Sequence, residues 1–279
     1  MKNYPFEVKP IAGAIGAELY GIDVGADLSD DTIGEIRRAL LEYQVIFFRD
    51  QDITPAQHSA FTARFGELDI YPFVKGLDDH PEIIEVSKKE DETVNFGGFW
   101  HTDTPYLPEP SLGSILLARQ VPPFGGDTEW ANTYLAYNRL SPRMKDMLEG
   151  LQGINSAAKG QVAATRVHRA AEKGTGLPVN EKFCSHPIVR THPETGRKAL
   201  YCSPAHVTAI EGMTVEESAP ILNYLFSWQV RSEFTCRFRW DVGSIAFWDN
   251  RASLHNPIND YHGYARMMHR TTLKGDRPQ

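Results

Sequence analysis

The chain alternates short apolar runs with turn residues over much of its length. Residues 5–28 contain four glycines between such runs, a pattern that predicts short strands joined by tight turns. The wholly apolar run 45–48 predicts a strand that passes through the core. Residues 83–86 and 113–118 predict two more strands, and strict alternation predicts another over 234–240. The dominant period is therefore that of a β protein.

Helices are predicted where a capping residue precedes a helical pattern. Ser29 can cap a helix whose apolar stripe ends at Tyr43, and Thr54 followed by a proline opens a second that ends at Gly66. Two short helices are predicted near 132–140 and 141–150. A capping box at Thr214 predicts a longer helix to about Val230.

Many strands and few helices set the expected fold class. They favour a mainly β fold with flanking helices (α+β) and a double-stranded β-helix, or jelly-roll, core. A length of 279 residues with 41% hydrophobic content predicts a single domain over residues 1–279. The polar, poorly periodic stretch near 153–183 predicts a lid or insertion.

The composition limits the classes of binding partner and the cellular compartment that we expect. A net charge of −7 argues against nucleic acid or an anionic membrane as the main partner. The three cysteines are odd in number and widely spaced, which favours buried thiols in a reducing compartment. The N-terminus lacks a signal-peptide core, and no apolar run approaches membrane-spanning length. We therefore expect a cytoplasmic protein.

The pair His101 and Asp103, with His255 near the C-terminus, is the candidate metal site. Residues i and i+2 of an extended segment project from the same side, so His101 and Asp103 can converge on one ion. Two imidazoles and one carboxylate occupy one face of an octahedral metal in non-haem Fe(II) oxygenases. A zinc or manganese hydrolase could use the same ligands, and a non-catalytic binding module could retain the fold.

Six blocks in order carry a family resemblance. They are 65–68 (FGEL), 100–103 (WHTD), 125–128 (GGDT), 186–193 (HPIVRTHP), 248–251 (WDNR) and 268–270 (MHR). Together they resemble the taurine dioxygenase and 2,4-dichlorophenoxyacetate dioxygenase (TauD/TfdA) family of Fe(II)- and 2-oxoglutarate-dependent oxygenases. The resemblance covers nearly the whole chain.

The resemblance implies roles for five residues. His101, Asp103 and His255 would bind iron, Arg266 would pair with the distal carboxylate of 2-oxoglutarate, and the Thr128 hydroxyl would donate to that carboxylate. The implied reaction uses O2 to hydroxylate a small organic anion, such as a sulfonate, sulfate ester, phenoxy acid or other carboxylic acid, and yields succinate and CO2. A product hydroxylated on a heteroatom-bearing carbon could then fragment. The family often forms homodimers or homotetramers, so we expect one of these.

The expected substrate pocket departs from the taurine pattern. By resemblance, Arg270 would contact the substrate's anionic group. Tyr71 stands where the family has a histidine, Val74 where it has a tyrosine, and Gly97 where it has an asparagine. We therefore predict an anion more hydrophobic than taurine. Predicted pocket residues are Tyr71, Phe73, Val74 and Phe99, with Asn95, Ser156 and Lys159 as candidates at the rim, whereas His186, His192, His206 and His269 are predicted to be structural.

Overall fold

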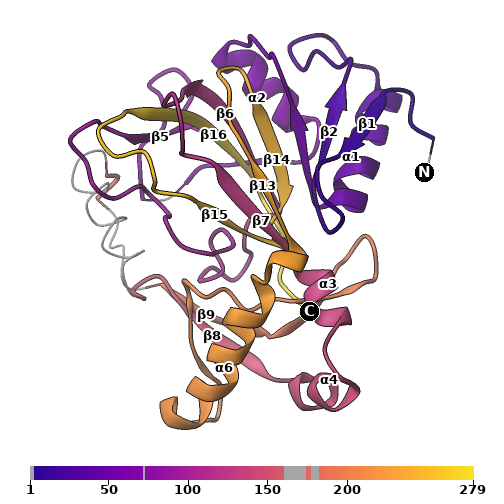
Figure 1. The fold of residues 1–279 in the computed structure, drawn as a ribbon, viewed down its shortest axis with the longest axis vertical. Helices are drawn as coiled ribbons and strands as arrows, with labels where there is room; N and C mark the ends of the chain where they lie inside the picture. Colours follow the sequence, from indigo (N-terminus) through magenta and orange to yellow (C-terminus); the bar gives the residue numbers. More distant parts are fainter. Residues whose placement is uncertain (1–2, 72, 160–173, 177–181) are drawn as a thin grey trace.

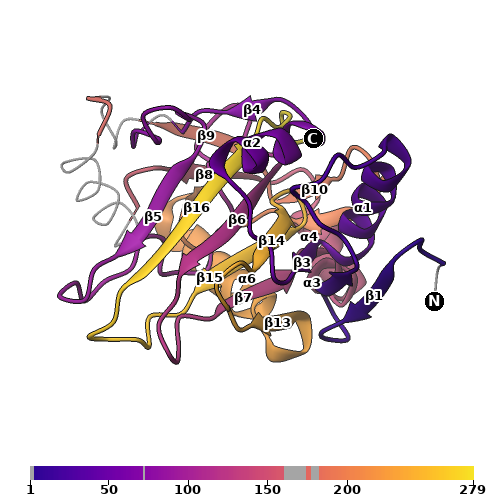
Figure 2. The same ribbon diagram turned by 90° about the horizontal axis from the view of Figure 1, so that it is seen from above.

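A large, mostly antiparallel sheet forms the frame of the molecule (Figures 1 and 2). The computed structural model describes residues 3–71, 73–159, 174–176 and 182–279. Within the described residues, β2 and β3 are the only neighbouring strands of this sheet that pair in parallel. In spatial order its strands are β1 (Glu7–Pro10), β2 (Ala17–Tyr20), β3 (Val45–Phe48), β14 (Ile245–Asp249), β6 (Gly113–Gln120), β16 (Arg266–Leu273) and β4 (Leu68–Asp69), and β5 (Ile84–Lys88) also pairs with β16.

Two helices, α1 (Asp30–Tyr43) and α2 (Pro55–Ala63), pack on the outer face of this sheet. The Ser29 hydroxyl accepts a hydrogen bond from the first turn of α1, and Thr54 forms a complete capping box with Gln57. Both predicted helix starts are confirmed. The apolar side chains between helices and sheet form one cluster, which includes Ile36, Ile46, Phe61, Ile115 and Phe247.

A smaller sheet faces the inner side of the large one. Its strands are β13 (Thr235–Phe238), β7 (Thr128–Asn132) and β15 (Ser253–Pro257), paired in the order β13-β7-β15. Phe47 of β3 stacks on Phe238 of β13 with ring centroids 4.0 Å apart, and Trp130 and Trp248 fill the space beside them. The two-layer arrangement agrees with the predicted jelly-roll core, and the mainly β fold class is confirmed.

The remaining elements extend from one end of the two sheets, at the bottom of Figure 1. They share a third apolar cluster around Ile188, Leu200 and Leu225. They are α3 (Thr133–Asn138), α4 (Pro142–Leu148), α6 (Val215–Gln229), the 3-10 turn Ser232–Phe234, the sheet β12-β8-β9 (Val207–Ile210, Gln152–Ser156, Phe183–Pro187) and the hairpin β10-β11 (Val189–Thr191, Lys198–Leu200).

The predicted insertion near 153–183 begins and ends on paired strands. β8 covers its first residues and β9 starts at its last, and the two strands pair antiparallel. Residues 160–173 and 177–181 lie outside the described residues, so the lid and the single-domain organisation both stay predictions. None of the helices in the described part of the chain is long and apolar enough to cross a membrane.

Candidate active site

The three predicted metal ligands meet between the two sheets. His101 and Asp103 lie on an irregular segment between β5 and β6, and His255 lies on β15. The backbones of His101 and His255 form a β-bridge, with reciprocal N–H to carbonyl distances of 2.9 and 2.7 Å. One ligand atom from each of the three residues lies within 4.8 Å of the others, and all three residues are buried. The sequence prediction that they converge agrees with this geometry.

Hydrogen bonds orient the ligands. His101 Nδ1 lies 2.6 Å from the Phe99 carbonyl, so Nδ1 carries the proton and the Nε2 lone pair is directed at the meeting point. The Oδ2 atom of Asp103 accepts from Ser114 at 2.9 Å. Oδ1 lies 3.8 Å from Nε2 of His101 and 4.0 Å from Nε2 of His255. These are the orientations that outer-shell partners impose on metal ligands.

The protonation states also suit a metal. Burial opposes ionisation of Asp103, but Arg270 and the two imidazoles outweigh it and hold the pKa of that carboxyl well below its usual range. Burial, with help from His101, lowers the pKa of His255 well below the ordinary histidine value. A carboxylate and neutral imidazoles are the forms that bind metals. The donor set therefore fits a ferrous ion with open positions opposite it.

Thr128 and Arg266 line a cavity of about 460 Å³ together with His101 and His255. Arg266 is 5% exposed, and its Nε and Nη2 have no partner among the described residues. Trp240 Nε1 donates to the Thr128 hydroxyl at 3.0 Å, which leaves the hydroxyl proton for another acceptor. An unpaired, buried guanidinium beside a hydroxyl is a site for a carboxylate, because an unsatisfied buried charge is costly.

A second cavity of about 320 Å³ adjoins the first, and Phe96, His101 and Arg270 line both. Arg270 lines both, donates from Nη1 to Asp103 at 3.2 Å, and has no described partner for Nε. The other side chains that line the second cavity, apart from Asp103, are mostly aromatic or imidazole groups: Tyr71, Phe96, Tyr106, His101 and His206. An anion held by Arg270 would therefore have an apolar remainder.

Several predicted pocket residues lie elsewhere. Val74 and Phe73 pack in an aromatic cluster and do not line either cavity. Asn95 is buried but donates to the Pro257 carbonyl at 3.1 Å. Phe99 is 37% exposed, because the turn that brings its carbonyl to His101 directs its ring outward. Their substrate contacts stay predictions that these positions do not support, whereas Tyr71 does line the second cavity.

The two rim candidates after β8 also lie outside both cavities. Lys159 Nζ donates to the carbonyls of Pro204 and Val207, and so holds the loop that carries His206. The Ser156 hydroxyl accepts from the backbone of Ala158 at 3.1 Å. Both side chains satisfy local backbone groups, and neither prediction of a substrate contact is supported by their positions.

Sequence reasoning missed Phe96, His206 and Trp240. Phe96 lines both cavities, and His206, which was predicted to be structural, lines the second with its ring 5.4 Å from that of Tyr106. Trp240, at the end of the predicted strand 234–240, orients Thr128, and its ring lies 5.6 Å from the Arg266 guanidinium. The strict alternation over 234–240 could have indicated that Trp240 faces the same interior as the strand carrying Thr128.

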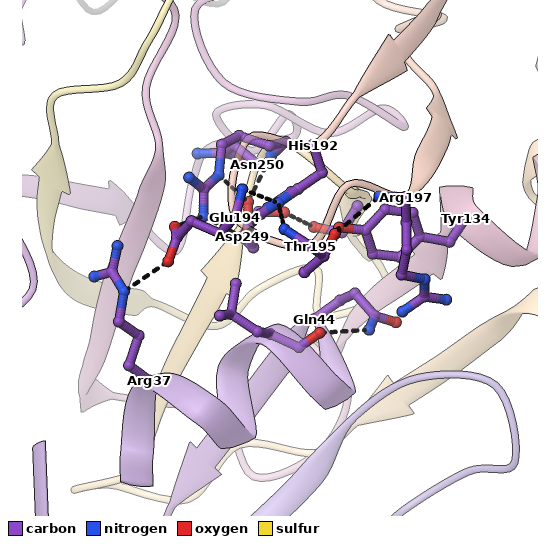
Figure 3. A network of polar contacts seen from close by, with 12 residues as sticks. Arg37, Gln44, Tyr134, His192, Glu194, Thr195, Arg197, Asp249 and Asn250 are labelled. Atoms are coloured by element: carbon purple, nitrogen blue, oxygen red, sulfur yellow. Dashed lines mark hydrogen bonds and ion pairs between the residues drawn. The ribbon is translucent and has the colours of Figure 1, made fainter. Parts of the chain in front are cut away.

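A second cluster of polar residues surrounds Asp249 (Figure 3). We call it the Asp249 network, and it consists of Asp249, Arg251, His192, Glu194 and Arg37. Asp249 accepts two hydrogen bonds from the Arg251 guanidinium, at 2.9 and 2.7 Å, and one from His192 Nε2 at 3.0 Å. Arg251 also pairs with Glu194, which pairs in turn with Arg37 of α1. The next residue, Asn250, reaches Asp103 through its side chain. The network thus connects α1 to the ligand segment.

Comparison with known proteins identifies the family. The family model described as taurine catabolism dioxygenase TauD, TfdA family matches residues 7–272. The chain belongs to the TauD/TfdA family. The resemblance drawn from the six sequence blocks is confirmed.

Relatives of this TauD/TfdA member include the alpha-ketoglutarate-dependent sulfate ester dioxygenase of Pseudomonas putida, which is 32% identical over 98% of this chain and 90% of that protein. The (S)-phenoxypropionate/alpha-ketoglutarate-dioxygenase of Sphingobium herbicidovorans is 31% identical over 97% and 96%. The crystal structure of a taurine dioxygenase from Burkholderia xenovorans superposes with a TM-score of 0.83 and 39% identity, over 98% and 92% of the two chains.

Membership settles the class of enzyme. Alpha-ketoglutarate is 2-oxoglutarate, so this TauD/TfdA protein is a 2-oxoglutarate-dependent dioxygenase that uses Fe(II) and O2, as predicted. The hydrolase and binding-module alternatives are not supported.

Proposed function

We propose that this dioxygenase hydroxylates an organic sulfate ester or aryloxy acid that is more hydrophobic than taurine. The observation that supports the proposal most is the position of Arg270, a buried guanidinium that lines a mostly aromatic cavity together with the metal ligands His101 and Asp103 and whose Nε has no partner among the described residues. Relatives of this chain act on sulfate esters and on phenoxypropionate. Both are anions with apolar remainders.

The proposed roles within the site follow from its chemistry. His101, Asp103 and His255 would hold the ferrous ion, and Arg266 with Thr128 would bind the distal carboxylate of 2-oxoglutarate. Arginine presents a planar fork of donors that matches a carboxylate, so Arg266 fixes the orientation of the cosubstrate as well as its charge. Iron, when bound, supplies the oxygen activation that hydroxylates the substrate carbon. The side chains supply position and exclude water.

Arg270 has two tasks in this proposal. One nitrogen donates to Asp103 and stabilises its charge, while Nε remains available to the anionic group of the substrate. Substrate held there would extend its apolar part toward Tyr71, Phe96 and Tyr106, close to the ligand atoms of His101 and Asp103. Hydroxylation of a carbon that bears an ester oxygen would give an unstable product, which collapses to a carbonyl compound and the free inorganic anion.

A substrate screen tests the proposal. Alkyl sulfate esters, aryloxypropionates, alkyl sulfonates and taurine would be compared by succinate formation coupled to O2 consumption, with carbonyl product and sulfate measured separately. We expect the apolar anions to be turned over and taurine to be poor. Efficient turnover of taurine with the apolar anions inert would contradict the proposal.

A matched variant separates substrate binding from metal binding. Arg270→Met removes the charged hydrogen bonds to the anion and should raise KM for the best substrate roughly ten- to a hundredfold. Iron content measured on the same preparation shows whether the metal site has survived the loss of the Asp103 contact. An unchanged KM with normal iron content would exclude Arg270 as the anion ligand.

We also propose that the protein forms a single domain, is cytoplasmic, and assembles as a homodimer or homotetramer. Cys184, Cys202 and Cys236 are free thiols, which is typical of a reducing compartment. Light scattering during size-exclusion chromatography would give the assembly, and a monomer at micromolar concentration would contradict that part.

A further inference from the structure

Lys88 is a buried cation on the cavity side of the large sheet. It ends β5, and the whole residue is only 2% exposed. Side chains alternate along a strand, so Lys88 projects from the same face as Val86. Val86 lines the larger cavity together with Thr128 and Arg266. The Lys88 side chain therefore belongs to the layer that surrounds the proposed 2-oxoglutarate site.

The strand register places Lys88 directly opposite Arg266. β5 and β16 pair antiparallel, with Lys88 and Arg266 as cross-strand partners. Directly opposed residues have Cβ atoms about 4.5–5.5 Å apart, and like charges at such positions destabilise the sheet. Burial also lowers the pKa of Arg266, as expected for a charge removed from water. Two buried cations thus project from one face of the sheet beside the cavity.

The surroundings of Lys88 do not neutralise it. Its ammonium has three N–H donors, but its contacts are a long hydrogen bond of 3.4 Å to the Tyr264 carbonyl and the ring of Tyr261 at 4.5 Å. In the part of the chain that the structure describes, no carboxylate lies within 4.0 Å of Lys88 Nζ. Asp127, which lowers the cost of the Arg266 charge, is itself bound by Arg237 at 2.7 Å.

An uncompensated pair of buried cations indicates a ligand of opposite charge. A buried charge without a counter-ion is costly, and a carboxylate between or beside the two cations would remove that cost. We propose that Lys88 is a second cation of the site for the distal carboxylate of 2-oxoglutarate, where it acts through space beside Arg266. The inference rests on the roles proposed above for Arg266 and Thr128.

A purely structural role for Lys88 is the competing explanation. Its hydrogen bond to Tyr264 could simply hold the loop between β15 and β16 in place. The two explanations differ in how they depend on the ligand. Attraction between charges requires the distal carboxylate, whereas a structural contact would influence any 2-oxo acid that chelates the iron.

The experiment compares two 2-oxo acids of equal carbon number. Binding of 2-oxoglutarate and of 2-oxopentanoate, which lacks the distal carboxylate, is measured calorimetrically on the Fe(II)-loaded enzyme without oxygen. The variants are Lys88→Met, Lys88→Arg, Arg266→Met and, as the matched control, Lys89→Met, which alters the exposed neighbouring lysine. Thermal midpoints of all variants show whether each is folded.

Lys88→Met should weaken 2-oxoglutarate binding about tenfold, the effect of one charge several ångströms away at an intermediate dielectric constant, and leave 2-oxopentanoate unchanged. Lys88→Arg should restore most of the affinity, and Lys89→Met should change neither ligand. Equal weakening of both acids, or no weakening of either, would overturn the inference. If Arg266 does not bind the distal carboxylate, the Arg266→Met variant will bind 2-oxoglutarate normally. This outcome distinguishes a failure of the proposed Arg266 role from a failure of the Lys88 inference.

Discussion

The cavity between the sheets and the Asp249 network contain the same kinds of buried side chain, but their hydrogen-bonding groups are used differently. In the network, both nitrogens of His192 are bonded and Arg251 pairs with two carboxylates. In the cavity, His255 Nδ1, two nitrogens of Arg266 and one of Arg270 have no partner among the described residues. Satisfied buried groups maintain a fold, and unsatisfied ones indicate where ligands bind.

The largest effect is expected from changing a residue of the cavity. His255→Ala removes one of three metal ligands, so iron affinity should fall by more than the roughly 10- to 100-fold typical of losing an outer-shell partner, and succinate formation should cease. Metal analysis after dialysis and an O2 electrode measure the two quantities. His262→Ala, at an exposed histidine, is the control. Full iron retention by the His255 variant would show that the ion is held elsewhere.

The second-largest expected effect is on the free energy of unfolding, and it should differ between variants of Arg251 and Arg266. Arg251→Met leaves Asp249 and Glu194 without their shared cation, and should cost about 3–5 kcal/mol in the free energy of unfolding. Arg266→Met removes a cation that has unpaired nitrogens in the protein alone, so the stability of the metal-free enzyme should be unchanged or increased. Urea unfolding at pH 7 measures both. Equal losses in the two variants would refute the distinction between network and cavity.

His58 provides an intermediate case. It is fully buried, its Nε2 contacts Thr271 at 3.1 Å, its Nδ1 has no described partner, and it lines neither cavity. Burial lowers its pKa to about 3, whereas an unfolded histidine titrates near 6.5. Between these pH values only the unfolded state takes up the proton, so His58 should reduce stability as the pH falls, by at most about 1.4 kcal/mol per pH unit.

The His58 prediction is checked with unfolding curves at pH 7, 6, 5 and 4. His58→Gln should lose stability at pH 7, because the buried site is altered, but should show a shallower decline toward acid than the wild type. His262→Gln serves as the exposed control. Parallel declines in the wild type and His58→Gln would mean that His58 does not titrate as described.

The smallest expected effect concerns Phe99. Its side chain is partly exposed and lies outside both cavities, so Phe99→Ala should change the substrate KM by no more than about twofold. Phe96→Ala, at a residue five positions before His101 that lines both cavities, should change it more. Kinetics with the best substrate from the screen would decide, and a larger effect at Phe99 would support the prediction that Phe99 contacts the substrate.

Local signals were sufficient for much of the fold. Ser29, Thr54 and Thr214 each begin a helix where the sequence predicts one, because a capping hydroxyl acts within one turn of its own backbone. Strands with uniform or alternating apolar residues, such as 45–48, were also predicted correctly. Boundaries shifted by a few residues where no cap fixes them, as at the end of α2.

The candidate site was predictable only in part. The ligand set and Arg266 came from motif spacing and family resemblance, which do not depend on knowing the fold. Phe96 and His206 could not be recognised, because both lie on irregular segments whose path is set by tertiary contacts, such as the Lys159 hydrogen bonds to the His206 loop. The exposure of Phe99 could not be foreseen for the same reason, because one turn decides whether its ring faces inward.

The reciprocal backbone hydrogen bonds between His101 and His255 have a consequence for metal exchange. They fix the spacing of the two imidazoles through main-chain atoms, so the coordination geometry is prepared without help from the ion. Structural zinc domains, in contrast, unfold when their metal is removed. A chelator should therefore strip this enzyme to a folded, inactive form, and added ferrous salt should restore turnover without a refolding step.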